Sequence, residues 1–210
     1  MNSIKNRVRV KICGLTRAQD VQAAAAAGAD YLGFVFARSP RQLTAQQAAA
    51  LVKSLPAAVT SVGLFMDAHE RDVRAVMDNV PLDMLQFHGN EDNDWCRQFG
   101  KPFIKAVAMG GATSMDVIHD SFPDASGLLY DGHAPGAAGG TGATFDWSLL
   151  SQAGPEFWLA GGLNPGNIIE AIEQCRPWAV DASSGVEDCP GIKNHELLRE
   201  FVRRAKSVEL

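Results

Sequence analysis

The sequence has few cysteines and no long apolar run. Its four cysteines, Cys13, Cys96, Cys175 and Cys189, match no metal-binding spacing. Four cysteines in 210 residues are too few for a disulfide framework, which favours a reducing compartment. The N-terminal residues are positively charged but form no continuous apolar stretch, and no segment approaches the ~20 apolar residues of a membrane span. We therefore expect a cytoplasmic protein without a membrane partner.

An excess of positive charge is also missing. The chain has 19 Lys and Arg against 24 Asp and Glu, a formal net charge of -5. Nucleic acids and anionic membranes require a basic face, so neither is expected as a partner. A small anionic substrate is compatible with this charge, because local donors can outweigh it. The length and the 46% hydrophobic content suit one globular domain over residues 1–210.

Two familiar cofactor signatures are absent. No Gly-x-Gly-x-x-Gly sequence follows the first predicted strand, so dinucleotide binding has no support. Of the five histidines, His69, His119 and His195 fall in helical patterns, which leaves His88 and His133 near predicted strand ends. This distribution argues against the metal site of metal-dependent sugar epimerases. We expect no metal and no cofactor.

Short apolar runs alternate with longer amphipathic segments from Val8 onward. The predicted strands cover residues 8–12, 31–36, 60–65, 83–87, 102–107, 126–130, 156–160 and 178–181. The predicted helices cover residues 17–27, 45–54, 69–78, 91–99, 112–120, 146–151, 165–174 and 193–206. Alternating β and α elements imply a parallel sheet with right-handed crossovers. Eight such units favour a closed α/β TIM barrel, (β/α)8, over an open doubly wound sheet.

Helix ends are marked by local signals. Three pairs have the spacing of a capping box: Thr16 and Gln19, Thr44 and Gln47, Asp67 and Glu70. Asn164 and Pro165 predict an N-cap followed by proline in the first helical turn. Gly28 follows a run of alanines and predicts a helix end.

In such a barrel the chemistry lies at the C-terminal ends of the strands. This rule selects Cys13 after the first strand, Arg41 after the second, His88 after the fourth and Asp131 after the sixth. It also selects residues 65–67 after the third strand. His88 either lines the pocket or closes the loop after its strand, and we assign it no proton transfer.

The segment from Asp131 to Thr144 is long, irregular and contains five glycines. Loops of this length in compact domains are commonly functional or mobile. Asp181 of the last strand is expected to pair with Lys11 or Lys105, or to help hold the site.

The loops after the last two strands are candidates for phosphate binding. Gly161 and Gly162 let backbone N–H groups approach a ligand, and a predicted helix follows them. Ser183, Ser184 and Gly185 repeat the arrangement one strand later with hydroxyl donors added. The loops after strands seven and eight commonly hold phosphate in TIM barrels. The alternative is that both are tight turns that require glycine.

Taken singly, the catalytic candidates also have structural readings. A lone cysteine at a strand end is more often a small buried apolar residue than a base. Asp131, which precedes a glycine, could be a turn former. The ordered set of motifs along the chain decides between these readings.

From Val8 to the last helix the chain resembles the phosphoribosylanthranilate isomerases of tryptophan biosynthesis. The resemblance rests on these segments in order: VKICGLT, GADYLGFVF followed by SPR, VGLF, LQFHG, IKA, LLYD, GGTGATFDW, LAGGLNP and VDASSGVE. Any one of them would be weak, but the ordered set is specific.

The resemblance implies a cofactor-independent Amadori rearrangement of a phosphosugar-anthranilate, an aminoaldose, on a (β/α)8 barrel. The family's general base corresponds to Cys13 and its general acid to Asp131. Arg41 corresponds to a family arginine that contacts the anthranilate carboxylate or the intermediate. Tyr130 occupies a position that the family often fills with leucine, which should not disturb the acid beside it. Members occur as monomers or homodimers, so either state is expected.

The residue types suit this chemistry. Ring opening requires a carboxylic acid that is still protonated near neutral pH, and removal of the C2' hydrogen requires a base. Cationic neighbours and the adjacent helix start should lower the pKa of Cys13, and Lys11 on the same strand face is a candidate for this effect. Three alternatives remain: another phosphosugar enzyme, a broader isomerase that also accepts the related histidine-pathway substrate, and an inactive barrel that senses a phosphosugar.

Overall fold

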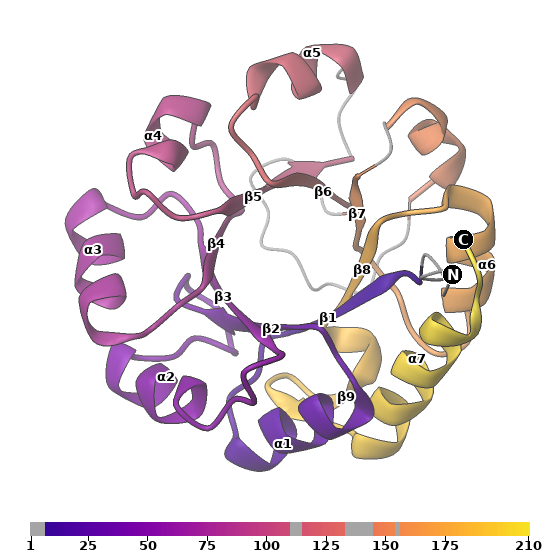
Figure 1. Cartoon of the computed structure of the whole chain (residues 1–210), viewed down its shortest axis with the longest axis horizontal. Helices are drawn as coiled ribbons and strands as arrows, with labels where there is room; N and C mark the ends of the chain where they lie inside the picture. Colours follow the sequence, from indigo (N-terminus) through magenta and orange to yellow (C-terminus); the bar gives the residue numbers. More distant parts are fainter. Residues whose placement is uncertain (1–6, 110–114, 133–144, 154–155) are drawn as a thin grey trace, which may run out of the picture.

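The computed structural model of the chain describes residues 7–109, 115–132, 145–153 and 156–210. Eight parallel strands form a closed barrel in sequence order, β1 to β8, and the helices surround it (Figure 1). The predicted TIM-barrel fold is confirmed. Most of the predicted loop 131–144, together with His133, lies outside the described residues.

The barrel strands follow the predicted ranges closely. They are β1 (Arg9–Cys13), β2 (Tyr31–Val35), β3 (Thr60–Phe65), β4 (Met84–Phe87), β5 (Phe103–Ala108), β6 (Gly127–Asp131), β7 (Trp158–Leu159) and β8 (Ala179–Ala182). The helical segments are α1 (Ala18–Ala27), α2 (Ala45–Val52), α3 (Glu70–Asn79), α4 (Asn93–Arg97), α5 (Met115–Ser121), the 3-10 helix η1 (Trp147–Gln152), α6 (Ile168–Cys175) and α7 (His195–Ser207). No helix in these described ranges is long and apolar enough to cross a membrane.

Side-chain alternation on the strands separates two environments. Val10 and Ile12 of β1 are fully buried in the core between the barrel and its helices. Lys11 and Cys13 project to the opposite face, into the barrel. This period of two is the pattern from which the strand was predicted.

Aromatic side chains fill the N-terminal end of the barrel. The ring of Trp158 lies 4.8 Å from that of Tyr31 and 5.2 Å from that of Trp178. The guanidinium of Arg9 covers Trp178 at 4.2 Å from the ring centroid. The tryptophans at this end therefore serve packing, as expected, and polar side chains inside the barrel gather toward the C-terminal end.

Local signals predicted some helix ends and failed at others. Thr44 and Gln47 form the predicted capping box at the start of α2. Gly28 ends α1 with φ 92°, the left-handed conformation that favours glycine.

Three predicted helix starts are wrong because other hydrogen bonds occupy their side chains, two of them long-range and one local. Thr16 Oγ1 donates to the carbonyl oxygen of Gly191, and α1 begins after Arg17 instead. The Asp67 side chain accepts from the backbone N–H of Asn90, and α3 begins after His69. Asn164 closes a turn onto Gly166, so α6 begins only at Ile168.

A short hairpin after β8 was not predicted. A 3-10 turn, η2 (Ser184–Val186), leads into β9 (Glu187–Cys189), which pairs antiparallel with β10 (Ile192–Lys193). The Lys193 backbone N–H donates to buried Asp20 of α1 at 3.2 Å. The hairpin is thereby held against the first β-α connection, next to Cys13.

Candidate active site

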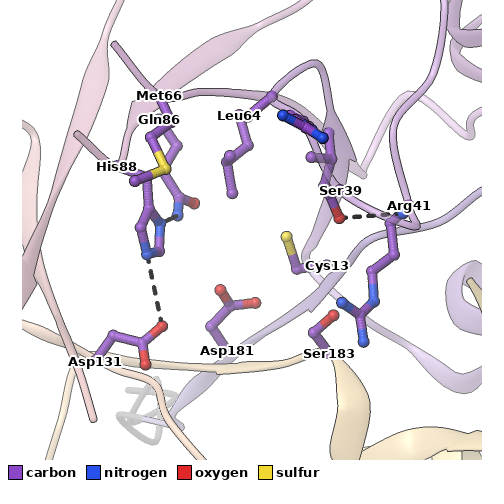
Figure 2. Close-up of a pocket in the computed structure, with 13 residues that line it drawn as sticks. Cys13, Ser39, Arg41, Leu64, Met66, Gln86, His88, Asp131, Asp181 and Ser183 are labelled. Carbon is purple, nitrogen blue, oxygen red and sulfur yellow. Dashed lines mark hydrogen bonds and ion pairs between the residues drawn. The ribbon is translucent and has the colours of Figure 1, made fainter. Parts of the chain in front are cut away.

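A cavity lies at the C-terminal end of the barrel (Figure 2). It is lined by Cys13, Val35, Ala37, Arg38, Ser39, Arg41, Leu64, Met66, Gln86, His88, Asp131, Asp181 and Ser183. The structure thus brings together five of the predicted site residues, from strands far apart in the sequence: Cys13, Arg41, His88, Asp131 and Ser183. Of residues 65–67, only Met66 lines the cavity.

Cys13 ends β1 and is 5% exposed. Burial raises the pKa of its thiol above the ordinary value, although Lys11 and Lys193 lower it. The expectation of a lowered pKa was wrong, because the cost of burying the thiolate exceeds the attraction of the two cations. At neutral pH, Cys13 in this environment is therefore a thiol.

Lys11 and Asp181 form an ion pair inside the barrel. Their Nζ and Oδ2 atoms lie 2.7 Å apart, and the residues are register partners on β1 and β8. Burial lowers the pKa of Lys11, but the carboxylate of Asp181 beside it raises the pKa, and the net shift is upward, so the lysine stays charged. Of the two predicted partners, Lys11 is correct, since Lys105 pairs with Glu91 at 2.9 Å.

Asp131 ends β6 and is 7% exposed. His88 Nε2 lies 3.8 Å from its Oδ2. On the other side of the imidazole, Nδ1 lies 3.2 Å from the amide nitrogen of Gln86. An amide N–H donates, so Nδ1 of a neutral His88 accepts and Nε2 carries the hydrogen toward Asp131. His88 was predicted either to line the pocket or to close the loop after its strand, and it lines the pocket.

Arg41 lines the cavity but is engaged by a second side chain. Its Nε and Nη2 donate to the two carboxylate oxygens of Glu187 at 2.9 and 2.6 Å. Lys193 Nζ adds a bond of 2.7 Å to Glu187 and one of 3.0 Å to the carbonyl oxygen of Ser183. This network fixes the guanidinium beside Cys13 and leaves Nη1 as the nitrogen that the Glu187 pair does not use.

The two predicted phosphate loops pack against each other beside the cavity. Gly161 and Gly162 have φ of 88° and 64°. A Cβ at Gly161 would overlap the backbone nitrogen of Gly132 and lie 3.1 Å from Asp131 Oδ1. A Cβ at Gly185 would overlap the carbonyl oxygen of Leu163. Both glycines are thus required by close approach. Ser183 lines the cavity, whereas Gly161, Gly162, Ser184 and Gly185 stand next to it.

Sequence reasoning missed Gln86, Glu187 and Lys193. Gln86 stands two positions before His88 on β4, so the period of the strand could have placed it on the same face. The pairing of Glu187 with Arg41 spans 146 positions and depends on the unpredicted hairpin, so no local pattern signals it. In the described part of the chain, no group of three His, Cys, Asp or Glu side chains could hold a metal ion.

The model of the N-(5'-phosphoribosyl)anthranilate (PRA) isomerase family matches residues 10–204. The chain belongs to this family. The PRA isomerase of Thiobacillus denitrificans is 50% identical over 202 residues, which is 95% of this chain and 98% of that protein.

Solved PRA isomerases share the fold. The enzyme from Thermotoga maritima superposes with a TM-score of 0.86 at 37% identity, over 96% of this chain and 100% of its own. A PRA isomerase in complex with reduced 1-(o-carboxyphenylamino)-1-deoxyribulose 5-phosphate superposes with a TM-score of 0.83 at 35% identity and the same coverage. Another structure describes monomers derived from the dimeric Thermotoga maritima enzyme, at 35% identity and TM-score 0.82 over 96% and 100%.

Proposed function

We propose that the chain converts N-(5'-phosphoribosyl)anthranilate, an aminoaldose, into 1-(2-carboxyphenylamino)-1-deoxyribulose 5-phosphate, an aminoketose, in tryptophan biosynthesis. The observation that carries the proposal is the cavity shared by Cys13 of β1 and Asp131 of β6, a candidate base and a candidate acid at the C-terminal end of one barrel. Family membership over nearly the whole chain supports the same reaction.

Asp131 is proposed as the general acid. Its protonated carboxyl group gives a proton to the furanose ring oxygen, the C1'–O bond breaks, and the anilino nitrogen forms a protonated Schiff base. The N–H that His88 directs at Asp131 from 3.8 Å stabilises the carboxylate left behind. A positioned acid or base of this kind contributes about 10²–10⁴ in rate.

Cys13 is proposed as the general base. Its thiolate removes the C2' hydrogen, and the electron pair of the C–H bond neutralises the Schiff base to give an enolamine. Proton uptake at C1' and proton loss from the 2'-hydroxyl then complete the ketone. The positive Schiff base in this buried cavity, together with Lys11 and Lys193, lowers the pKa of Cys13, so that the thiol releases its proton to water and the thiolate forms. The base is therefore available when the cation has formed.

The two charged ends of the substrate are proposed to bind at different parts of the cavity. Arg41, held by Glu187, is proposed to bind the anthranilate carboxylate through Nη1. The phosphate is proposed to bind the paired loops of residues 161–162 and 183–185, with the N-terminal end of α6 following the first of them. None of these steps requires a metal or a cofactor.

Three broader expectations accompany the proposal. The closed barrel from β1 to β8 supports a single domain over residues 1–210. A cytoplasmic location and a monomeric or homodimeric state stay predictions from the sequence.

The direct test is to follow the loss of PRA fluorescence on addition of the purified protein, without added metal. Turnover supports the proposal. Absence of turnover by a folded protein that still binds the reduced product analogue would favour a phosphosugar sensor instead.

A further inference from the structure

Two buried acceptor oxygens face the cavity. Gln86 Oε1 and Asp181 Oδ1 have no hydrogen-bond partner among the described residues. Gln86 is fully buried and Asp181 is 9% exposed, and both line the cavity. A buried acceptor without a donor is costly and rare in folded proteins, so each oxygen requires an explanation.

The other polar atom of each side chain is committed to a neighbour. Asp181 Oδ2 accepts from Lys11 Nζ at 2.7 Å. Gln86 Nε2 lies 3.2 Å from His88 Nδ1. These contacts hold both side chains in fixed orientations, and Figure 2 shows the Gln86 oxygen and the Asp181 carboxylate directed into the space between the strands. The two oxygens are therefore preorganised for a donor that enters the cavity.

Their position relative to the acid and the base is also informative. Figure 2 shows Asp181 between Cys13 and Asp131 along the rim of the cavity. Gln86 is on β4, four strands from β8 around the closed barrel. The two oxygens therefore face the cavity from opposite sides of the barrel, and a molecule bound in the cavity lies between them.

We propose that Gln86 Oε1 and Asp181 Oδ1 bind hydroxyl groups of the sugar chain of the substrate. The inference rests on the proposed function and adds the positions that hold the reacting carbons. Carboxylate and amide oxygens only accept hydrogen bonds. The phosphate and carboxylate ends of the substrate are also acceptors, so its hydroxyls, besides one anilino N–H, are the groups able to satisfy two acceptors.

The alternative is that Asp181 only forms the ion pair with Lys11 and Gln86 only holds His88, with no contact to the substrate. The two readings differ in ligand dependence. A hydroxyl-binding residue discriminates between ligands with and without hydroxyls, whereas a structural residue changes the binding of both equally.

The experiment is calorimetric titration with two probes. One is reduced 1-(o-carboxyphenylamino)-1-deoxyribulose 5-phosphate, and the other is N-(5-phosphopentyl)anthranilate, which keeps both charged ends but lacks the hydroxyls. Asp181→Asn replaces the free acceptor by an amide N–H donor at nearly constant shape. We expect this variant to reduce the affinity for the hydroxylated probe by about 10–100-fold, the range for a hydrogen bond to a charged group. The affinity for the dehydroxylated probe should fall by less than about 3-fold.

Matched variants separate packing and charge from hydrogen bonding. Gln86→Met and Gln86→Glu both remove the N–H donor to His88, but only Gln86→Glu keeps an acceptor oxygen. Therefore only Gln86→Met should weaken the binding of the hydroxylated probe more than that of the dehydroxylated probe. Asp30→Asn neutralises another carboxylate that pairs with a lysine, Lys206, but at the start of β2 and thus at the opposite end of the barrel, and should leave both affinities unchanged.

Equal weakening of both probes by Asp181→Asn, or no weakening of either, overturns the inference for Asp181. If that variant does not fold, the comparison of Gln86→Met with Gln86→Glu decides in the same way. Turnover of PRA by the unmodified protein tests the proposed function separately, so the two failures are distinguishable.

Discussion

Cys13 lies directly against Gly33. The two residues are register partners on β1 and β2, and a Cβ built on Gly33 would stand 2.8 Å from the Cys13 sulfur. Real Cβ atoms essentially never approach another heavy atom this closely. The absence of a side chain on β2 thus creates the space that the proposed base occupies.

Gly33→Ala should move the thiol and lower kcat. A displacement of about 1 Å in a reacting group costs on the order of 10²-fold. The matched control is Gly127→Ala, where the new methyl group would meet the Trp158 indole nitrogen at 2.6 Å, at the other end of the barrel. We expect the control to lose stability but to keep kcat within about 3-fold, given its distance from the reacting groups. Equal effects of the two variants on kcat would contradict this account.

The raised pKa of Cys13 predicts slow alkylation at neutral pH. The thiolate is the nucleophile, so the rate of reaction with iodoacetamide should rise with pH through a midpoint above the ~8.5 of an ordinary thiol. For stability, a raised pKa gives a contribution that is present below the unfolded pKa and is lost as pH rises through the folded one. The product analogue, which shields the cavity, should suppress alkylation. A midpoint below that of a free thiol would show that the cations outweigh burial.

Glu187→Gln should weaken the hold on Arg41 and raise KM more than it lowers kcat. Burial raises the pKa of Glu187, but its bonds to Arg41 and Lys193 lower it more, so the net shift is downward. Such a carboxylate contributes stability above its unfolded pKa, about 4.3, and this stability is lost as pH falls through the folded pKa. The variant should therefore lose less stability than the parent as the pH falls below about 4.3.

Steady-state kinetics and urea unfolding at several pH values measure both effects. Glu200→Gln is the control, because Glu200 also binds two arginines, Arg203 and Arg204, but is a half-exposed residue of α7 that does not line the cavity. Its KM should equal that of the parent. An unchanged KM for Glu187→Gln would remove the proposed role of the pair in substrate binding.

Tyr130→Phe should leave the protein as stable or more stable. Tyr130 is fully buried in the outer core, its hydroxyl has no partner among the described residues, and burial raises its pKa to about 12. Removal of an unsatisfied buried hydroxyl should raise the free energy of unfolding by about 1 kcal/mol, which corresponds to roughly 2–4 °C in Tm for a chain of this size. Thermal unfolding of the variant measures this. A fall in Tm of the same size would mean that the hydroxyl makes a stabilising contact.

The barrel could be predicted because its signals are local and repeated. Each strand shows a period of two or an apolar run, each helix follows a loop, and eight repeats leave few topologies. Capping succeeded at Thr44, where no distant group competes for the hydroxyl. It failed at Thr16, whose hydroxyl is taken by Gly191 from the hairpin at the far end of the chain.

The sequence predicted several residues that line the cavity, but it did not predict the interactions between them. Position at strand ends selected Cys13, Arg41, His88 and Asp131, and all four line the cavity. The direction of the Cys13 pKa shift was wrong because it depends on the balance between burial and charge in three dimensions, which no sequence pattern reports. Glu187 was missed because its partner is reached only through the fold.

The central claim is that Cys13 and Asp131 perform the proton transfers. Kinetics and thermal unfolding of Cys13→Ala and Asp131→Ala test it most directly, with Cys175→Ala as a control at a cysteine outside the cavity. We predict that each cavity variant loses about 10²–10⁴ in kcat with Tm nearly unchanged, while the control keeps its activity. A large fall in Tm with only a modest fall in kcat would contradict the account and assign both side chains to the packing of the barrel.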